Sequence, residues 1–368
     1  MKKLLITAAA LLVAGLMFAC SDMDYYVQSI KGHMNMMAQT RPISLLVEDP
    51  LTSAEDKQRL IKVLEIRNFA VSELGLPDND SYRHYADIGR PYVVWNVVAA
   101  PEFSLQPRQW CFPVAGCVAY RGYFDQASAE ALGARLRDEG YDVNVYGVQA
   151  YSTLRWFNDP VLNTFFSSSD GNLAGLLFHE LAHQVVYLAG DSSFNEAFAK
   201  TVEIEGVRRW FNEKASEEEV RRYLDHEAQV EVFQDFLRET RSQLDELYHR
   251  PLGEEEMREA KLALFRTAGE RHAQLKKAGR IDDRFDAWMK RGLNNARLAS
   301  VATYRDLVPG FQALLEKNRG DLSRFYDDVA RLSRQPEPQR YFQLQGVFQV
   351  ERHALQQPPV ADEKVLVD

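Results

Sequence analysis

Apolar residues change their spacing several times along the chain, and each change predicts a different kind of element. From residue 21 to about 88 they recur every three or four positions, which predicts helices ending near Gly75 and Pro77. The residues with this spacing are Leu60, Val63, Leu64, Ile66, Phe69, Ala70 and Leu74. From about 90 to 150, β-branched and aromatic runs predict strands at 92–98, 117–120 and 141–146, with a helix at about 126–139.

Two helices are predicted between about 171 and 213. The serine-rich loop 167–169 and Asp170 supply N-cap residues for the first helix, and Gly190 with Asp191 predicts its end. The second helix is expected from about Ser193 to Trp210. Beyond residue 215 the pattern is charged, amphipathic and helical, and the tail from 356 to 368 is predicted to be disordered. Breaks are expected at Pro251, Gly279, Pro309 and Gly320.

The first of these two helices is apolar enough to belong in a core, yet it carries His179, Glu180 and His183. Buried polar groups must be paired or must coordinate a metal. Residues four apart lie on one helix face, so the two imidazoles can hold one Zn²⁺. Glu180 would then act as a base on the water at that metal. The alternative is a pair of hydrogen-bonded core histidines.

A catalytic zinc keeps three protein ligands and one open position, so a third ligand is expected downstream. Glu196 is the candidate. Glu203 follows two turns later on the same face, where its carboxylate could orient a ligand histidine through the free ring N–H. Glu196 could instead form a capping box with Ser193. Glu205 and His226 are the competing ligands.

The segment 194–199, Phe-Asn-Glu-Ala-Phe-Ala, followed by Glu203, resembles the Asn-Glu-Gly-Phe-Ala…Glu helix of gluzincin aminopeptidases. The segment 179–183 is similar to their zinc helix. The resemblance implies that Asn195 lies beside the ligands together with Glu203. The spacer between the two motifs is shorter here, and Ala197 replaces the usual glycine. The Gly-Ala-Met-Glu-Asn segment, which holds the free amino group of the substrate in those enzymes, is absent, so amino- and endopeptidase action both stay open.

More broadly, the chain is similar to a family of predicted aminopeptidases, mostly lipoproteins of Gram-negative bacteria. The resemblance runs nearly end to end. It includes Cys20 with residues 24–26, the segments 113–117 and 120–124, the two predicted zinc helices, and 294–304. It implies a zinc-dependent peptidase that acts on a peptide substrate.

The N-terminus carries an export signal. Lys2 and Lys3 precede an apolar run from Leu4 to Ala19, too short and wrongly flanked for a stable transmembrane helix. Cys20 follows at the expected cleavage boundary, which predicts lipidation of Cys20 after removal of residues 1–19. Ser21 resembles the outer-membrane sorting pattern, so the protein is expected on the periplasmic side of the envelope, lipid-anchored. Ordinary cleavage and an uncleaved anchor are the alternatives.

The net charge and the cysteine content indicate which partners the protein is not expected to bind and how its cysteines are paired. The formal net charge of −9 argues against nucleic acid and anionic lipid head groups as partners. Besides Cys20, the chain has only Cys111 and Cys117, which flank a turn-like segment. A disulfide between them is expected in an oxidising compartment. A second metal site is not expected at these cysteines, because two cysteines without a nearby histidine are too few ligands. The oligomeric state stays open.

The predicted architecture is an α+β fold with a zincin-like core. We expect a signal peptide at 1–19, an N-terminal helical region at 20–88, a zincin-like catalytic core at 89–213 and a helical C-terminal region at 214–368. The core is expected to contain a small mixed β-sheet and the zinc helix pair. The C-terminal region is expected to complete the active-site cleft.

The predicted activity is peptide-bond hydrolysis, with aminopeptidase action favoured. Glu180 takes a proton from the attacking water and passes it to the leaving amine. The tetrahedral intermediate also needs an oxyanion donor. Tyr304 is the candidate, because gluzincins often use a tyrosine or histidine from outside the zinc helices; it could equally be a core residue. The competing donors are Tyr120, Tyr123 and Tyr151. The alternative functions are a zincin-like scaffold without turnover and an amidase acting on cell-wall peptides.

Overall fold

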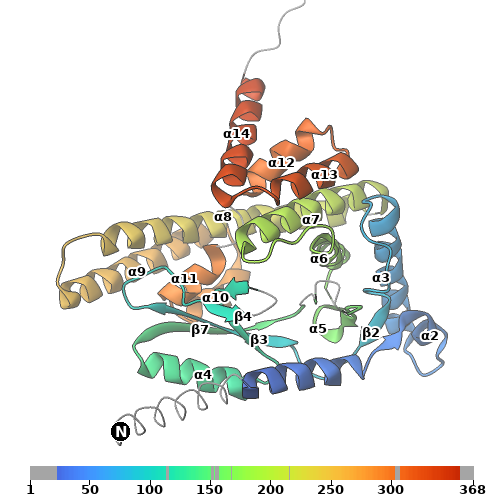
Figure 1. Cartoon of the computed structure of the whole chain (residues 1–368), viewed down its shortest axis with the longest axis horizontal. Coiled ribbons are helices and arrows are strands. Elements are labelled where there is room, and N and C mark those ends of the chain that lie inside the picture. Colours follow the sequence, from blue (N-terminus) through green and yellow to red (C-terminus); the bar gives the residue numbers. More distant parts are fainter. Residues whose placement is uncertain are drawn as a thin grey trace, which may run out of the picture.

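The computed structural model describes residues 23–356 apart from 113–115, 151–152, 154–156, 167, 215 and 303–306. The fold is α+β, 63% helical, with small sheets, as the sequence predicted at that level. Figure 1 shows the sheets enclosed between helices, with the last helices, α12 to α14, stacked at one end. In the part of the chain that the structure describes, no helix is long and apolar enough to cross a membrane.

The strands form three small sheets rather than the one mixed sheet expected. One is mixed: β1 (Arg41–Pro42) pairs antiparallel with β2 (His84–Ala86), and β2 pairs parallel with β8 (Val161–Leu162). The second is antiparallel, in the order β6 (Arg121–Tyr123), β3 (Val94–Pro101), β7 (Tyr141–Val148). The third is the hairpin of β4 (Trp110–Phe112) and β5 (Gly116–Val118). β1, β2 and β8 are too short to carry a strand periodicity.

The helices before the sheets are a helix over 23–37, α2 (Ile43–Glu48) and α3 (Ala54–Ser72). Next come α4 (Gln126–Asp138), α5 (Asn163–Phe166), α6 (Asp170–Ala182) and α7 (Ser192–Lys214). The C-terminal part contains α8 (Glu217–Tyr248), α9 (Glu254–Lys277), the short η1 (Asp283–Phe285) and α10 (Asp286–Lys290). It continues with α11 (Asn295–Ala302), α12 (Val308–Lys317), α13 (Leu322–Leu332) and α14 (Glu337–Gln356).

Most of the predicted helix breaks are confirmed. Pro251 separates α8 from α9, and Gly279 and Gly320 follow α9 and α12 with positive φ, which a residue without Cβ adopts at little cost. Pro309 instead lies in the first turn of α12, where a missing N–H costs no hydrogen bond. The predicted disordered tail lies outside the described residues, except for Gln356.

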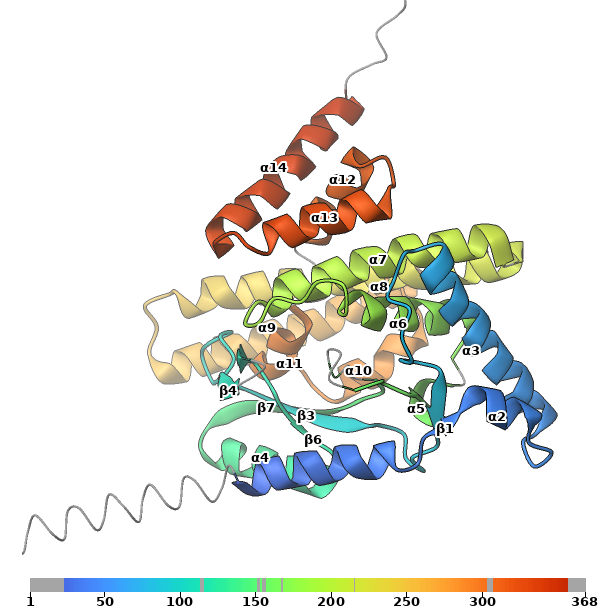
Figure 2. The same cartoon turned by 45° about the vertical axis from the view of Figure 1, so that its right-hand side comes forward.

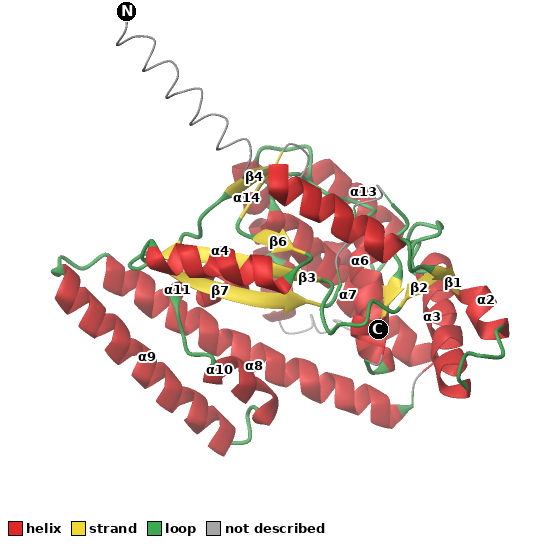
Figure 3. Cartoon of the chain, turned by 90° about the horizontal axis from the view of Figure 1, so that it is seen from below, coloured by secondary structure: helices red, strands yellow, loops and turns green. Residues whose placement is uncertain are grey.

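The β6–β3–β7 sheet has two covered faces. Val97, Ala99 and Val143 pack on one face against α4, and Figure 3 shows α4 lying along this sheet. Val98 and Ala100 pack on the other face against Ala296 of α11. The main core lies elsewhere, where α3, α6, α7, α12 and α13 bury their apolar faces together. α6 and α7 therefore belong to the main core, and Val94 and Asn96 of β3 line one cavity with residues of both helices.

Candidate active site

α6 ends earlier than the sequence predicted but keeps its polar residues in place. Ser169 caps its start by accepting a hydrogen bond from Asn172 N at 3.3 Å. The helix ends at Ala182 rather than near Gly190, and turns lead on to α7. His183 is the C-cap and is still in the right-handed helical region, with its N–H donating to His179 O. The two histidines therefore still project from one face, one above the other.

The start of α7 differs from the predicted capping box. Asp191 fills the capping role, since its Oδ1 accepts a hydrogen bond from Phe194 N at 3.0 Å. The Asp191 carboxylate is itself held by Arg340 and Tyr341 of α14. Glu196 is thus not used as a cap, and its carboxylate turns toward the histidines of α6.

Two glycines let α6 and α7 approach closely. A Cβ on Gly175 would lie 3.3 Å from Glu203 Cγ, and a Cβ on Gly206 would lie 2.6 Å from the Phe178 ring. Both contacts cross the interface between the helices. The close packing explains how carboxylates on α7 reach imidazoles on α6.

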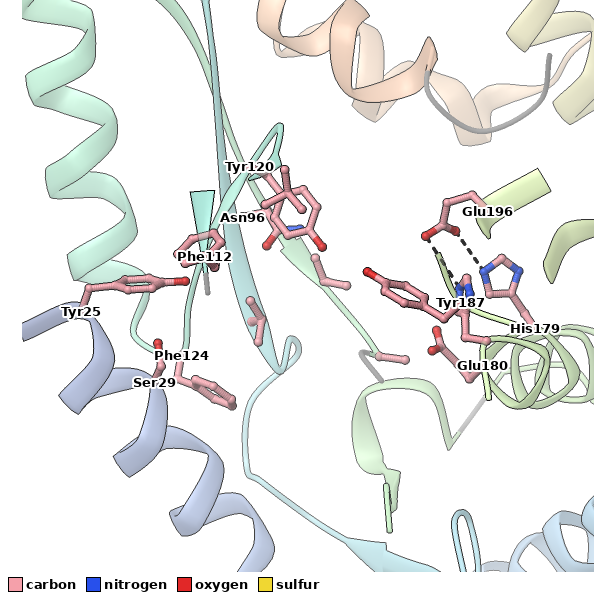
Figure 4. Close-up of a pocket in the computed structure, with 16 residues that line it drawn as sticks. Tyr25, Ser29, Asn96, Phe112, Tyr120, Phe124, His179, Glu180, Tyr187 and Glu196 are labelled. Atoms are coloured by element: carbon pink, nitrogen blue, oxygen red, sulfur yellow. Dashed lines mark hydrogen bonds and ion pairs between the residues drawn. The ribbon is translucent and has the colours of Figure 1, made fainter. Parts of the chain in front are cut away.

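His179, His183 and Glu196 converge on one point. Each offers one ligand atom, and these three atoms lie within 4.8 Å of one another. The Nε2 atoms of His179 and His183 lie 3.2 and 3.7 Å from the Glu196 carboxylate oxygens. Figure 4 shows the Glu196 carboxylate facing the His179 ring. This group could bind a metal ion.

The other side of the His179 ring is held by Glu203. His179 Nδ1 lies 3.1 Å from Glu203 Oε2, and Lys200 pairs with the same carboxylate. Burial alone would raise the pKa of Glu203, but Lys200 and His179 outweigh it and lower this pKa to about 2. An ionised acceptor at Nδ1 holds the proton on that nitrogen, so Nε2, which faces Glu196, is the nitrogen that a metal ion would bind.

The two histidines differ in their protonation states. Burial lowers the pKa of His183 to about 4, and the nearby His179 adds to this effect, so His183 is neutral at pH 7. Its buried Nδ1 has no hydrogen-bond partner among the described residues. Burial would also lower the pKa of His179, but the hydrogen bonds to Glu196 and Glu203 raise it to about 10, so a metal ion would displace the proton from its Nε2 on binding. Two nitrogens and one carboxylate oxygen are a donor set that fits zinc.

The Glu180 carboxylate faces the same cavity. Burial raises the pKa of Glu180 to about 7, against the opposing charge of His179. A carboxyl group with this pKa can both take and release a proton near neutral pH. Figure 4 shows it beside His179 and Glu196, below Tyr187.

The cavity has a volume of about 490 Å³ and runs from the α6–α7 residues to the β6–β3–β7 sheet. The wall opposite the histidines is largely apolar and aromatic. It contains Tyr25, Ser29, Val94, Asn96, Phe112, Val118, Tyr120, Gly122, Phe124, Val148 and Ala150. Apart from His179, Glu180, His183 and Glu196, the described lining residues are uncharged.

Three tyrosines line this cavity, and the charge of Glu196 acts on two of them, Tyr120 and Tyr187. Tyr120 lies between β5 and β6, and Tyr187 lies in the turn after α6. Burial raises the pKa of both, and the Glu196 charge adds to the effect, so both hydroxyls stay protonated and able to donate. Tyr120 was among the predicted donors, whereas Tyr187 was missed, although it follows His183 by four positions.

The other candidate residues lie away from this cavity or outside the described part of the chain. Tyr123 packs in the core between the sheet and α4, away from the cavity. Tyr304 and Tyr151 lie outside the described residues, and so does Cys20. Glu205 pairs with Arg208 and Arg209, and a ring nitrogen of His226 lies 2.7 Å from Arg284, so neither joins the ligand group.

Asn195 acts on the backbone beside the site. Its side chain donates to Leu188 O and accepts from Leu188 N, each at 2.8 Å. It therefore fixes the turn that joins α6 to α7. Gln184 has a similar effect on the loop after α3, through hydrogen bonds with Asn79 and Ser81. Lys200, the partner of Glu203, is a further residue that the sequence reasoning missed.

Cys111 and Cys117 form the expected disulfide across the β4–β5 hairpin. Its neighbours Phe112 and Val118 line the cavity, whereas Cys111 and Cys117 are exposed and alternate with them along the strands, so the disulfide lies on the other face of the hairpin. It closes a short loop whose middle residues, 113–115, lie outside the described part of the chain.

Comparison with known protein families matches residues 24–344 to the family described as "putative aminopeptidase". The chain belongs to this family. Membership supports a peptidase-type function for this aminopeptidase-family protein. No curated protein and no solved structure is similar enough to count as a match.

Proposed function

We propose that this protein is a zinc-dependent peptidase with a gluzincin-like site in a zincin-like core, and that it removes residues from the N-terminus of peptides. One observation carries the proposal. Ligand atoms of His179, His183 and Glu196 lie within 4.8 Å of one another, and Glu180 faces the cavity beside them. Family membership favours the aminopeptidase reaction.

Each residue has a role that follows from its position. His179, His183 and Glu196 would hold the ion, with His179 oriented by Glu203. When bound, zinc supplies Lewis-acid polarisation of the scissile carbonyl and of the attacking water. Glu180 takes the proton of that water and delivers it to the leaving amine, a transfer that suits its pKa of about 7.

Tyr187 and Tyr120 are the described hydroxyls that could donate to the developing oxyanion, and Tyr304 stays a third candidate. Both Tyr187 and Tyr120 line the same cavity as Glu180. The apolar wall across from the histidines would receive the substrate side chain and keep water away from the reacting carbonyl.

The experiment combines metal analysis with two peptide substrates. The purified protein should contain one zinc per chain and should cleave a free N-terminal peptide but not its N-acetylated twin. Glu180→Gln should keep zinc and lose about 10²–10⁴-fold in kcat, because an amide does not accept the proton. Glu130→Gln on the exposed face of α4 is the matched control.

Three results would contradict parts of this proposal. Near-normal turnover by Glu180→Gln would show that Glu180 is not the general base. Equal cleavage of the acetylated peptide makes the protein an endopeptidase. Zinc binding without cleavage of any peptide, including cell-wall peptides, makes it a binding protein.

We further propose that the protein is attached to the bacterial envelope on its periplasmic side through a lipid on Cys20, in the outer membrane by the Ser21 pattern. The support is the sequence of residues 1–21. Labelling with a palmitate analogue should mark the wild type and not Cys20→Ser. An unlabelled wild type would reject the lipid anchor.

A further inference from the structure

The helix over residues 23–37 is fixed against the sheet by one face. A Cβ on Gly32 would lie 2.2 Å from the Phe124 ring, so the helix backbone touches that ring directly. Gln28 Oε1 accepts a hydrogen bond from Phe124 N at 3.1 Å, and Met36 is buried. The Arg121 guanidinium lies 4.0 Å from the centre of the Tyr25 ring. These contacts set the rotation of the helix about its axis.

The opposite face of this helix is apolar and exposed. We call it the outer stripe, and its residues are Met23, Tyr26, Val27, Ile30 and Met34, which are 38–64% exposed. Their spacing of three, four and seven places all five on one side of the helix. Lys31 and Asp24 lie beside the stripe and not within it. Exposed Phe157 extends the apolar surface, since its ring lies 4.4 Å from that of His33.

Figure 2 shows this helix, in dark blue, at the outer edge of the molecule beside α4. Five large apolar side chains on one helix face are unusual on a surface that contacts only water. The chain that precedes the helix indicates what covers them. Leu4 to Ala19 is an uncharged and largely apolar run, Cys20 follows, and the described helix begins three residues later.

We propose that the outer stripe is a membrane-docking face and that helix 23–37 lies along the surface of a lipid bilayer. A lipid on Cys20 and an uncleaved apolar segment would both bring the start of this helix to a bilayer. From there the outer stripe enters the interface between head groups and acyl chains. The stripe has no charge of its own, so the contact is apolar and does not need anionic lipid.

The docking face and the cavity are linked through this helix. Tyr25 and Ser29, on the inner side, line the cavity that contains Glu180. A helix held on the bilayer would therefore keep one wall of the cavity next to the membrane surface. This inference rests on the envelope attachment proposed above and is independent of the zinc chemistry.

The test measures the depth of two labelled positions in the full-length protein. Ile30→Cys in the outer stripe and Asn35→Cys on the exposed polar side of the same helix each carry an environment-sensitive fluorophore. The protein is reconstituted on phosphatidylcholine vesicles that contain nitroxide-labelled lipid. The wild type, labelled in parallel, corrects for any reaction at the native cysteines.

We expect nitroxide lipid to quench the label at position 30 several-fold more than the label at position 35, with little effect of salt. A second variant combines the label at position 30 with Met23→Gln, Val27→Gln and Met34→Gln. It should lose most of the quenching. Its cleavage of a short soluble peptide should equal that of the singly labelled protein, which shows that it is folded.

Flotation with the vesicles separates the possible failures. If the wild type floats and both labels are quenched equally, the envelope attachment stands and the docking face is wrong. If the wild type does not float, both are wrong, while peptide cleavage still tests the enzyme proposal. If Ile30→Cys forms disulfide-linked dimers in detergent and its label is shielded there without lipid, the stripe binds a second copy and the membrane inference is overturned.

Discussion

Replacing Asp191 should destabilise the protein strongly, because its carboxylate accepts four hydrogen bonds. Oδ1 accepts from Phe194 N at 3.0 Å and from the Tyr341 hydroxyl at 2.9 Å. Oδ2 accepts from Arg340 Nε at 3.0 Å and from Nη2 of the same guanidinium. The Asp191 and Arg340 side chains are only 8% and 7% exposed, so water cannot replace a lost partner.

In Asp191→Asn, one acceptor oxygen can still cap α7 and meet Tyr341. The new amide NH₂ group, however, faces the guanidinium, and no hydrogen bond can form between them because both groups are donors. A buried charge that loses its partner costs about 3–5 kcal/mol, and we expect this loss in the free energy of unfolding. Arg340→Met should cost a similar amount, because it leaves the carboxylate buried with only neutral partners.

The double variant separates a true ion pair from two independent defects. With both charges gone, no unpaired charge is buried, so the double variant should be about 2–3 kcal/mol more stable than the sum of the single losses predicts. Denaturant unfolding, followed by circular dichroism, measures all four proteins. Asp78→Asn is the control, because its pair with Arg83 is exposed and should contribute at most about 1 kcal/mol. Additive losses, or single losses below that of the control, would refute the reasoning.

Glu203→Ala should weaken zinc binding about 10–100-fold in chelator competition, because His179 Nδ1 loses its acceptor. Glu203→Gln should weaken zinc binding less. Equal zinc affinity in both variants and the wild type would show that His179 needs no such partner. Tyr187→Phe should lower kcat about 10²–10³-fold with zinc content and melting temperature unchanged. If only the melting temperature falls, the oxyanion donor is to be sought at Tyr120 or Tyr304. Gly206→Ala should cost about 1–3 kcal/mol of unfolding free energy, because the new Cβ would contact Phe178. Gly269→Ala is the control and should not destabilise the protein, because Gly269 has open space around it. The same small effect at both positions would show that α6 and α7 can move apart freely.

Local patterns were enough for many features of the fold. The strands near 92–98 and 141–146 and the helix at about 126–139 appear as β3, β7 and α4, because their apolar alternation or capping is local. The breaks at Pro251, Gly279 and Gly320 follow from backbone chemistry alone. The pattern missed β1, β2 and β8, whose two or three residues pair only because distant segments meet.

The candidate site also has features that the sequence predicted and features that only the tertiary structure decided. The four-residue spacing of His179 and His183 holds on any helix, so the sequence alone placed them on one face. Which carboxylate would meet them was not decided by spacing, since Ser193 offered Glu196 a local capping role. Asp191 took that role, and α14 holds Asp191 in place from about 150 residues away along the chain.

The sequence by itself therefore determined the polar residues of α6, their spacing and the family resemblance, because these depend on neighbours within one or two helical turns. The tertiary structure decided the rest. Packing at Gly175 and Gly206 brings Glu196 and Glu203 to the two sides of the His179 ring, and chain folding brings Tyr120 and Tyr187 to one cavity. Contacts between residues far apart in the chain leave no periodic signal, so only the folded structure shows them.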